Sequence, residues 1–336
     1  MIKEGLLKFF QLWASLGYTS VVELMGGPLG RIFKPELCKK LEQEGVLPVR
    51  VNYAFTFFNS KDIDELDTAV KDTDMVCSAD LKLFVDGAAG NGGSWTTFEN
   101  TLGGHGLYAV CDGDTYGEEY NINRIVEKAD NRGLDIHYHL QGDEAIEVVL
   151  KAIESVLEKQ GRLNSVHTFY HLGFITDLQI KRMQKLGAHL IACVQPSMHW
   201  GFMKQTLIDF YGEQGKVSYP YKKLKDAGIA LAFSSDFPSN RLEFCGPTAN
   251  MATSLTGGGD PVSHPPLTME DLINGFTVAG AATTHMQNIG KLDIGYKADI
   301  VVYEKDLYSV SAEELSKDNP KVMSTWVGGR KVYENK

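Results

Sequence analysis

Short apolar runs alternate with helical segments along most of this chain, and this alternation constrains its fold more than any other feature of the sequence. Seven runs are predicted to be buried strands: 18–24, 48–55, 80–86, 134–140, 165–171, 188–195 and 229–236. Apolar spacing and glycine stops predict helices over 3–16, 35–44, 62–74, 119–132, 144–159, 176–186 and 219–227. The runs are too uniformly apolar for a sheet with one face in water, so they predict a parallel sheet covered by helices. Seven or eight such units are typical of a (β/α)8 TIM-like barrel.

The pattern changes after residue 237, where a loop is expected to run to residue 266. The tail is predicted to hold antiparallel strands, with Gly328-Gly329 as a hairpin turn. We therefore expect a barrel domain over 1–286 and a small C-terminal β element, half of a sandwich, over 287–336. The elements predicted beyond the loop are helices 268–275 and 278–287 and strands 295–303 and 322–333.

Charge and cysteine content indicate which classes of partner and which cellular compartment suit the chain. The net charge of the 336 residues is −10, and no basic tract is present, which argues against nucleic acid or an anionic membrane as a partner. No apolar run approaches the length of a membrane span. The five cysteines are widely scattered, which suits a reducing compartment. We expect a cytoplasmic protein that acts on a small molecule.

Residues able to bind a metal ion gather at the predicted ends of several strands. His137 and His139 are two residues apart, so they face the same side of a strand. His171, Lys82 and Asp236 occupy comparable positions in other runs, and in a barrel the carboxyl ends of the strands meet at one rim. Each histidine alone is more often a packing residue. The set together favours a site for a divalent ion, with zinc the leading choice.

Lys82 needs a separate argument, because a lysine inside a barrel is costly unless its charge is neutralised or paired. One interpretation is an ion pair with Asp86 or another carboxylate. The other is a lysine carboxylated by CO2, which turns the cation into a carboxylate-like metal bridge. The sequence leaves both open.

The order of these motifs resembles the amidohydrolase superfamily, and within it the amidohydrolase-3 branch of YtcJ-like proteins and N-substituted formamide deformylase. The resemblance runs from about residue 6 to the end of the chain. The segments that carry it are Leu16-Gly-Tyr-Thr-Ser-Val21, Leu81-Lys-Leu-Phe-Val-Asp-Gly87, His139-Leu-Gln-Gly-Asp143, His171, Gln195-Pro196, Ser235-Asp-Phe-Pro238, Gly290-Lys-Leu-Asp-Ile-Gly-Tyr-Lys-Ala-Asp-Ile-Val-Val302 and Val327-Gly-Gly-Arg-Lys-Val332.

The resemblance implies roles for particular residues. His139 and His171 would be metal ligands on the fifth and sixth barrel strands, and Lys82 would be the bridging, carboxylated lysine. Asp236 would bind the metal and carry the catalytic proton. His137 has no role in the family pattern, so it is expected to support or pack against the site, with ligation as the minor alternative.

The chain departs from the family pattern in one respect. Members carry a His-x-His pair on a first strand, and no residue before 137 belongs to such a pair. We therefore expect an incomplete barrel without that strand, with one metal ion retained, or two if the missing part is supplied. The open seam would be closed by another segment, by another subunit or by the N-terminal helix. The expected partners are therefore a second copy of the chain or a separate polypeptide that supplies the missing N-terminal part.

The predicted function is hydrolysis of an amide or formamide-like C–N bond by metal-activated water. The alternative is an inactive, truncated binding protein or fragment. A glycosidase-type barrel is a weak third choice, because the strand ends carry His and Lys rather than paired carboxylates. Substrate contacts are expected from Trp95, His105, His137 and Trp200, with loop packing as the competing explanation for each.

Overall fold

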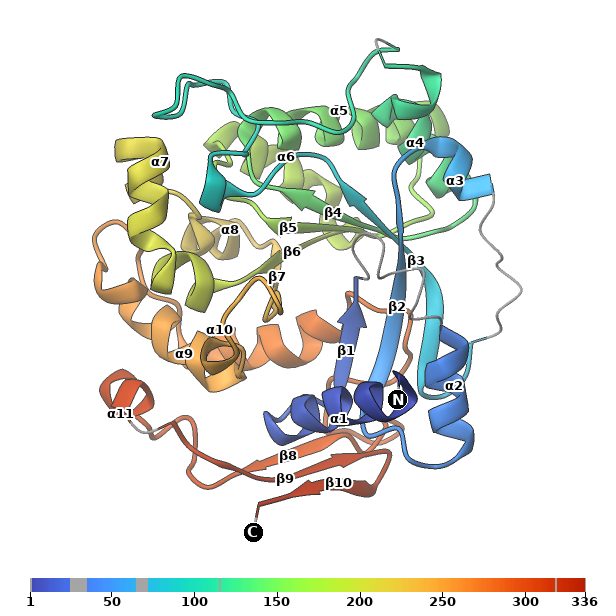
Figure 1. The fold of residues 1–336 in the computed structure, drawn as a ribbon, viewed down its shortest axis with the longest axis vertical. Coiled ribbons are helices and arrows are strands. Elements are labelled where there is room, and N and C mark those ends of the chain that lie inside the picture. Colours follow the sequence, from blue (N-terminus) through green and yellow to red (C-terminus); the bar gives the residue numbers. More distant parts are fainter. Residues whose placement is uncertain (1, 25–34, 65–71, 115, 318, 336) are drawn as a thin grey trace.

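Seven parallel strands form the main sheet of the molecule. The computed structural model describes residues 2–24, 35–64, 72–114, 116–317 and 319–335. The strands follow one another in chain order and curl into part of a barrel with helices on the outer side (Figure 1). This confirms the predicted α/β fold of an incomplete TIM-like barrel with a small second sheet. The strands are β1 (Ser20–Glu23), β2 (Arg50–Phe57), β3 (Val76–Phe84), β4 (Ile136–Leu140), β5 (His167–His171), β6 (Leu190–Val194) and β7 (Ala230–Phe233).

The central strands are buried on both faces. Every residue of β4, β5 and β6 is buried. In β4, Ile136, Tyr138 and Leu140 belong to the main hydrophobic core under the helices. The alternating residues His137 and His139 therefore face the inside of the barrel. This double burial is the reason that the strands are almost continuously apolar in sequence.

Helices connect the strands and cover the outside of the barrel. Some have clear local causes: the capping box of Thr176 and Gln179 starts α6, and the Asn121 side chain caps α4. Gly161, with φ of 72°, ends α5. The helices are α1 (Ile2–Ser15), α2 (Pro35–Gln43), α3 (Ser60–Asp64), α4 (Ile122–Asn131), α5 (Asp143–Gln160), α6 (Asp177–Leu186), α7 (Lys204–Lys216), α8 (Tyr221–Asp226), α9 (Pro247–Thr256), α10 (Met269–Asn274) and α11 (Ala312–Lys317).

Several predicted element boundaries are wrong. The expected loops before 219 and up to 266 contain α7 and α9. In α9 the buried residues include Asn250 and Ser254, so apolar spacing could not reveal it, and Gly212 interrupts the pattern of α7. The helix expected over 62–74 is described only as α3, since 65–71 lie outside the described residues and 72–74 are not helical.

The helix expected near 278–287 is right only at its start, because the backbone is helical as far as 281. The backbone continues from α10 through a π-helical turn, Gly275–Ala279, and then breaks into turns. Within the described ranges, no helix combines the length and apolar character needed to cross a membrane.

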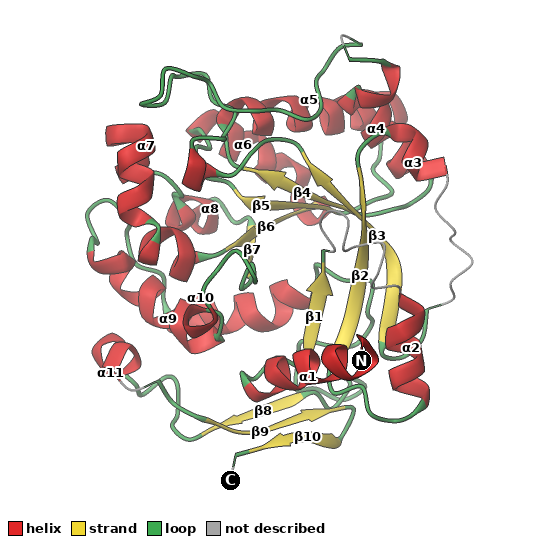
Figure 2. Cartoon of the chain, viewed as in Figure 1, coloured by secondary structure: helices red, strands yellow, loops and turns green. Residues whose placement is uncertain are grey.

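The tail forms a small antiparallel sheet of β8 (Ile300–Tyr303), β9 (Val322–Val327) and β10 (Arg330–Glu334). Gly328 and Gly329 make the predicted turn, with φ of 57° and 77°. Helix α1 lies between this sheet and the barrel (Figure 2), and Thr325 donates a hydrogen bond to the Ala14 carbonyl at 2.7 Å. A domain boundary at 286/287 stays a prediction.

Candidate active site

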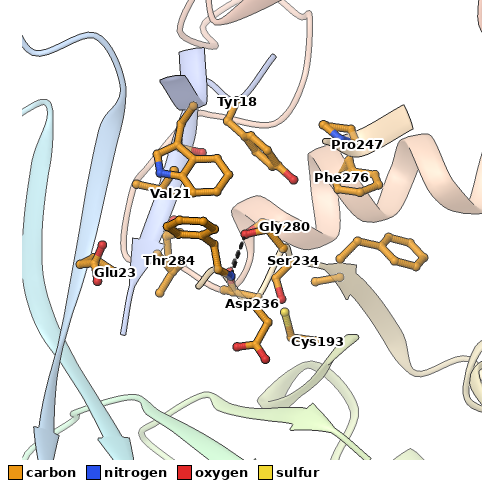
Figure 3. A pocket seen from close by; sticks show the side chains of 18 of the residues that line it. Tyr18, Val21, Glu23, Cys193, Ser234, Asp236, Pro247, Phe276, Gly280 and Thr284 are labelled. Carbon is orange, nitrogen blue, oxygen red and sulfur yellow. Dashed lines mark hydrogen bonds between the residues drawn. The ribbon is translucent and has the colours of Figure 1, made fainter. Parts of the chain in front are cut away.

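A cavity of about 1300 Å³ lies between β1 and β7 and extends from α1 and the tail sheet to the carboxyl ends of the barrel strands. Lys82, His139, His171 and Asp236, the four residues predicted to hold the metal, all line it. Figure 3 shows Asp236 at the end of β7 and Glu23 on β1 in this cavity. Its remaining wall is rich in aromatic side chains from α1 and the segments around β7: Phe9, Phe10, Trp13, Tyr18, Phe237 and Phe276.

His139 and His171 meet from adjacent strands. The Nδ1 atom of His139 lies 3.0 Å from Nε2 of His171, and both rings are almost fully buried. Parallel pairing of β4 with β5 places Leu140 beside His171, so both rings come from the last residues of the strands before the loops. The contact follows from the strand register together with a left-handed backbone at His171, which has φ of 73°.

The far nitrogens of the two rings fix their protonation. His171 Nδ1 donates a hydrogen bond to Gln195 Oε1 at 2.8 Å, and the Gln195 amide nitrogen is in turn directed to Ser234 Oγ at 2.7 Å. His139 Nε2 lies 3.4 Å from the Gly87 carbonyl oxygen, which can only accept. With both protons placed there, the facing nitrogens present two lone pairs to each other. Either His139 gives up its bond to Gly87, or a cation lies between the rings.

Burial keeps both imidazoles neutral. Desolvation, with a smaller contribution from Lys82, lowers the pKa of His171 to about 3. Desolvation and then His171 and Lys82 lower the pKa of His139 well below its ordinary value. Neutral imidazole is the metal-binding form of histidine. The two nitrogens are also 3.0 Å apart, near the ~3.3 Å that separates two ligands bound tetrahedrally at about 2.0–2.1 Å, so this pair suits a divalent ion.

Lys82 is buried among aromatic rings. Its ammonium nitrogen lies 4.8 Å from the centroid of Phe84 and 4.9 Å from that of Tyr170. Among the described residues, no carboxylate oxygen lies within 4.0 Å of it, so the direct ion pair with Asp86 considered above does not form. Desolvation lowers the pKa of Lys82 to about 8, against the opposing effects of Asp236 and Asp86. A larger share of this amine is therefore neutral than for an exposed lysine.

Asp236 follows β7 and has a left-handed backbone, with φ of 53°. Its side chain is half-buried and extends into the cavity (Figure 3). Desolvation raises the pKa of Asp236 to about 6, while Lys82 opposes this shift. The carboxylate is therefore a stronger base than an exposed aspartate and is still ionised at neutral pH.

Asp86 organises the loop that follows β4. Its Oδ2 accepts hydrogen bonds from the backbone N–H groups of Gly142 at 2.7 Å and Trp95 at 3.1 Å, and its Oδ1 accepts one from Gln141 at 3.0 Å. The same Oδ1 lies 3.9 Å from His139 Nε2. Burial raises the pKa of Asp86 to about 7, although the backbone donors oppose the change.

Two residues beside the site were missed from the sequence. Gln195, which orients His171, lies in the Gln195-Pro196 motif, but the motif alone suggested no role. His199 lies in a π-helical turn, Ser197–Phe202, inside the expected loop; its ring is 5.5 Å from that of His171 and its Nδ1 is 2.7 Å from the Tyr221 hydroxyl. No sequence signal pointed to it.

The four residues expected to contact substrate do not line the cavity. Trp95 stacks on Tyr108 with centroids 4.7 Å apart, and His105 is exposed. Trp200 is buried and donates to the Tyr219 carbonyl. His137 lies deeper in the barrel, with Nε2 3.1 Å from Asp80 Oδ2 and Nδ1 3.2 Å from the Tyr170 hydroxyl. A substrate role for any of them stays a prediction.

The chain matches a protein-family model described as "Amidohydrolase family" over residues 3–333. Among curated proteins, it is 25% identical over 227 residues to N-substituted formamide deformylase of Arthrobacter pascens, covering 66% of this chain and 41% of that protein. It is 26% identical over 271 residues to putative amidohydrolase YtcJ of Bacillus subtilis, covering 76% and 47%. The chain thus spans less than half the length of these relatives.

Solved structures share the fold. An uncharacterized metal-dependent hydrolase from Pyrococcus furiosus superposes with a TM-score of 0.74 at 22% identity, over 91% of this chain and 60% of that one. A second, from Pyrococcus horikoshii, gives a TM-score of 0.71 at 24% identity, over 93% and 59%.

Proposed function

Because the chain belongs to the amidohydrolase family, we propose that it is a divalent-metal hydrolase that cleaves an amide or formamide-like C–N bond in a small molecule. The observation that carries this proposal is the close approach of His139 Nδ1 and His171 Nε2, which lie 3.0 Å apart at the cavity wall on two imidazoles that burial keeps neutral. Zinc is our choice of ion, because the surrounding donors are imidazole and carboxylate. One ion would be held by Lys82, His139, His171 and Asp236, and a second if further ligands were supplied.

Lys82 would contribute as a carbamate. Its neutral amine attacks CO2, forms an N–C bond and releases one proton, which leaves an anionic carboxylate-like group. The lowered pKa of Lys82, about 8, favours the neutral amine that this reaction needs. The carbamate would also remove the cost of a buried ammonium group that lacks a close carboxylate.

Asp236 would move the proton in the reaction. A divalent ion held at the site would supply water with a pKa near 7 and would polarise the carbonyl under attack. Asp236 would accept a proton from the attacking water and deliver it to the leaving nitrogen as the C–N bond breaks. The aromatic wall formed by residues such as Trp13 and Phe276 favours substrates with an apolar substituent beside the scissile bond.

The test is hydrolysis of a panel of N-formyl and N-acyl amines by the full chain, with Zn2+ or Mn2+ added. The proposal expects metal-dependent amine release that Asp236→Asn lowers by about 10²–10⁴-fold and that the exposed-site control Asp112→Asn retains. If the chain binds such amides but releases no amine with either ion, the inactive binding protein is the better description.

We further propose a reducing, cytoplasmic location and a strand-donating partner. All five cysteines are free thiols, which supports the location. In the part of the chain that is described, the outer edges of β1 and β7 pair with no other strand. Such edges would accept a strand from a second copy, a separate polypeptide or another part of a longer chain.

A further inference from the structure

A second group of side chains of the types that bind metal ions lies outside the lining of the cavity. Nε2 of His285 is 2.8 Å from Oδ1 of Asp80 and 3.2 Å from Oδ2 of Asp135. The three ligand atoms all lie within 4.8 Å of one another. We call this group the lower cluster. None of its members lines the cavity.

The lower cluster lies toward the amino ends of the strands. Asp80 is two residues before Lys82 on β3, and Asp135 immediately precedes β4. The backbone N–H of His285 donates to Asn52 Oδ1, near the start of β2, at 3.3 Å. Strand register therefore separates this cluster from His139 and His171, which lie toward the carboxyl ends.

The polar atoms of the lower cluster are close together but poorly aligned for hydrogen bonds. Asp80 is only 1% exposed, and its Oδ2 accepts hydrogen bonds from Asn52 and His137. Its Oδ1 pairs with His285 Nε2 at 2.8 Å, but the ring N–H is poorly aligned for a hydrogen bond to this oxygen. Oδ1 is buried and points into the centre of the cluster, where a cation would be a better-placed partner than the ring N–H.

We propose that Asp80, Asp135 and His285 bind a divalent cation at the amino-terminal end of the barrel, in a site separate from the catalytic cavity. Two carboxylates and one neutral imidazole balance the charge of a dication. The mixed oxygen and nitrogen donors suit Mn2+ or Zn2+. His137 supports the site, because its bond to Oδ2 leaves Oδ1 of Asp80 turned toward His285.

The lower cluster is partly exposed to solvent, and a cation bound there would link distant segments of the chain. The side chains of His285 and Asp135 are 31% and 17% exposed, so the site is reachable from solvent although Asp80 is buried. The ion would join the segment after the π-helical turn to β3 and β4, which are more than a hundred residues away in sequence. A proton is the competitor, because the Asp135 and Asp80 carboxylates raise the pKa of His285 to about 10. Cation binding therefore displaces that proton.

The experiment titrates Mn2+ into the chelator-treated full chain and measures free Mn2+ by electron paramagnetic resonance. The proposal expects His285→Gln and Asp135→Asn each to bind one ion fewer per chain than the wild type, while the exposed control His105→Gln loses none. His139→Gln tests the cavity separately, and its loss should add to that of His285→Gln. Equal Mn2+ binding by wild type, His285→Gln and Asp135→Asn overturns the proposal, and so does a wild-type chain that binds no Mn2+.

A second measurement separates the cation site from a simple ion pair and does not depend on a variant that folds. The 15N resonance of His285 Nε2 is followed while Zn2+ is added to the wild-type chain. Loss of the Nε2 proton and a shift to the range of a metal-bound nitrogen are expected. If His285 keeps protons on both ring nitrogens at saturating Zn2+, the cluster is an imidazolium between two carboxylates and the proposal fails.

Discussion

The protonation states of the side chains in the cavity depend on their hydrogen-bond partners and on their burial. Gln195 Oε1 accepts a hydrogen bond from His171 Nδ1, and the Gly87 carbonyl oxygen lies 3.4 Å from His139 Nε2, so the other nitrogens of the two rings face each other between the strands. Asp236 and Lys82 have pKa values moved toward neutrality by burial, in opposite directions. Groups shifted in this way near one another are typical of functional sites.

Changing Asp236 to Asn is expected to lower kcat/KM by about 10²–10⁴-fold, because the proton carrier is lost. In the wild type, the carboxylate has to be ionised to act as a base. The pKa of Asp236 is about 6 in the metal-free chain, and a bound divalent ion lowers it, so the carboxylate is ionised and kcat/KM of the metal-loaded wild type should not fall because of Asp236 between pH 7 and 8. Steady-state rates of wild type and Asp236→Asn, each with metal added, test this. A variant as active as the wild type would contradict the role.

Changing Asp86 to Asn is expected to lower the free energy of unfolding by about 1–3 kcal/mol. Both carboxylate oxygens accept backbone N–H groups, from Gln141 and from Gly142 and Trp95, and the amide nitrogen of Asn would face one of these donors. Urea unfolding measures the change. The exposed variant Asp112→Asn serves as control and should stay within ~0.5 kcal/mol of wild type.

At the scale of elements, the site depends on how loops pack over the strand ends. The turn between β4 and α5 packs closely against the loop that follows β3. A Cβ atom on Gly142 would lie 1.7 Å from the Trp95 carbonyl oxygen, and Glu144 N–H bonds that same oxygen at 3.2 Å. The backbone of Gly142 is extended, with φ of −88°, so glycine is needed here for close approach rather than for a left-handed turn.

Gly142→Ala is therefore expected to cost about 3 kcal/mol of stability, because backbone must move to admit the methyl group. Gly5→Ala is the matched control. Gly5 lies in α1, and no atom lies within 4 Å of the position that a Cβ would take there, so alanine should stabilise the chain by about 0.5–1 kcal/mol. Denaturant midpoints compare the two. Equal effects would show that the loop contact is unimportant.

At the scale of the whole molecule, one buried ion pair ties the tail to the barrel. Arg50 of β2 is fully buried and donates two hydrogen bonds to Asp299, at 2.7 and 3.0 Å. Asp299 also accepts the Gly328 backbone N–H at the β9–β10 turn, at 2.7 Å. The aspartate of the Gly-Tyr-Lys-Ala-Asp motif therefore has a structural role in joining the two sheets.

Replacing Asp299 with Ala should lower the free energy of unfolding by about 3–5 kcal/mol, because a buried guanidinium loses its main partner. The exposed pair of Lys317 and Glu313 supplies the control, since Lys317→Ala should cost only about 0.3–0.5 kcal/mol. Chemical denaturation measures both. A cost for Asp299→Ala no larger than the control would mean that Asp74 alone satisfies Arg50.

Sequence by itself determined the parallel strands, most of the helices around them and the tail hairpin, because these follow from local apolar spacing, caps and glycine turns. It also pointed to Lys82, His139, His171 and Asp236, which line one cavity because they lie in or directly after neighbouring strands, although the left-handed backbone at His171 and Asp236 could not be predicted. It could not find α9, whose buried face is partly polar, or assign Gln195 its hydrogen bond to His171.

Only the tertiary structure decided which side chains meet. His137 and His139 are only two residues apart in sequence. In the structure His137 contacts Asp80 of the lower cluster, whereas His139 contacts His171 at the cavity. Asp80, Asp135 and His285 came together although no motif links them. The physical reason is that ligand geometry and burial depend on contacts between distant segments, which a one-dimensional pattern of polarity does not encode.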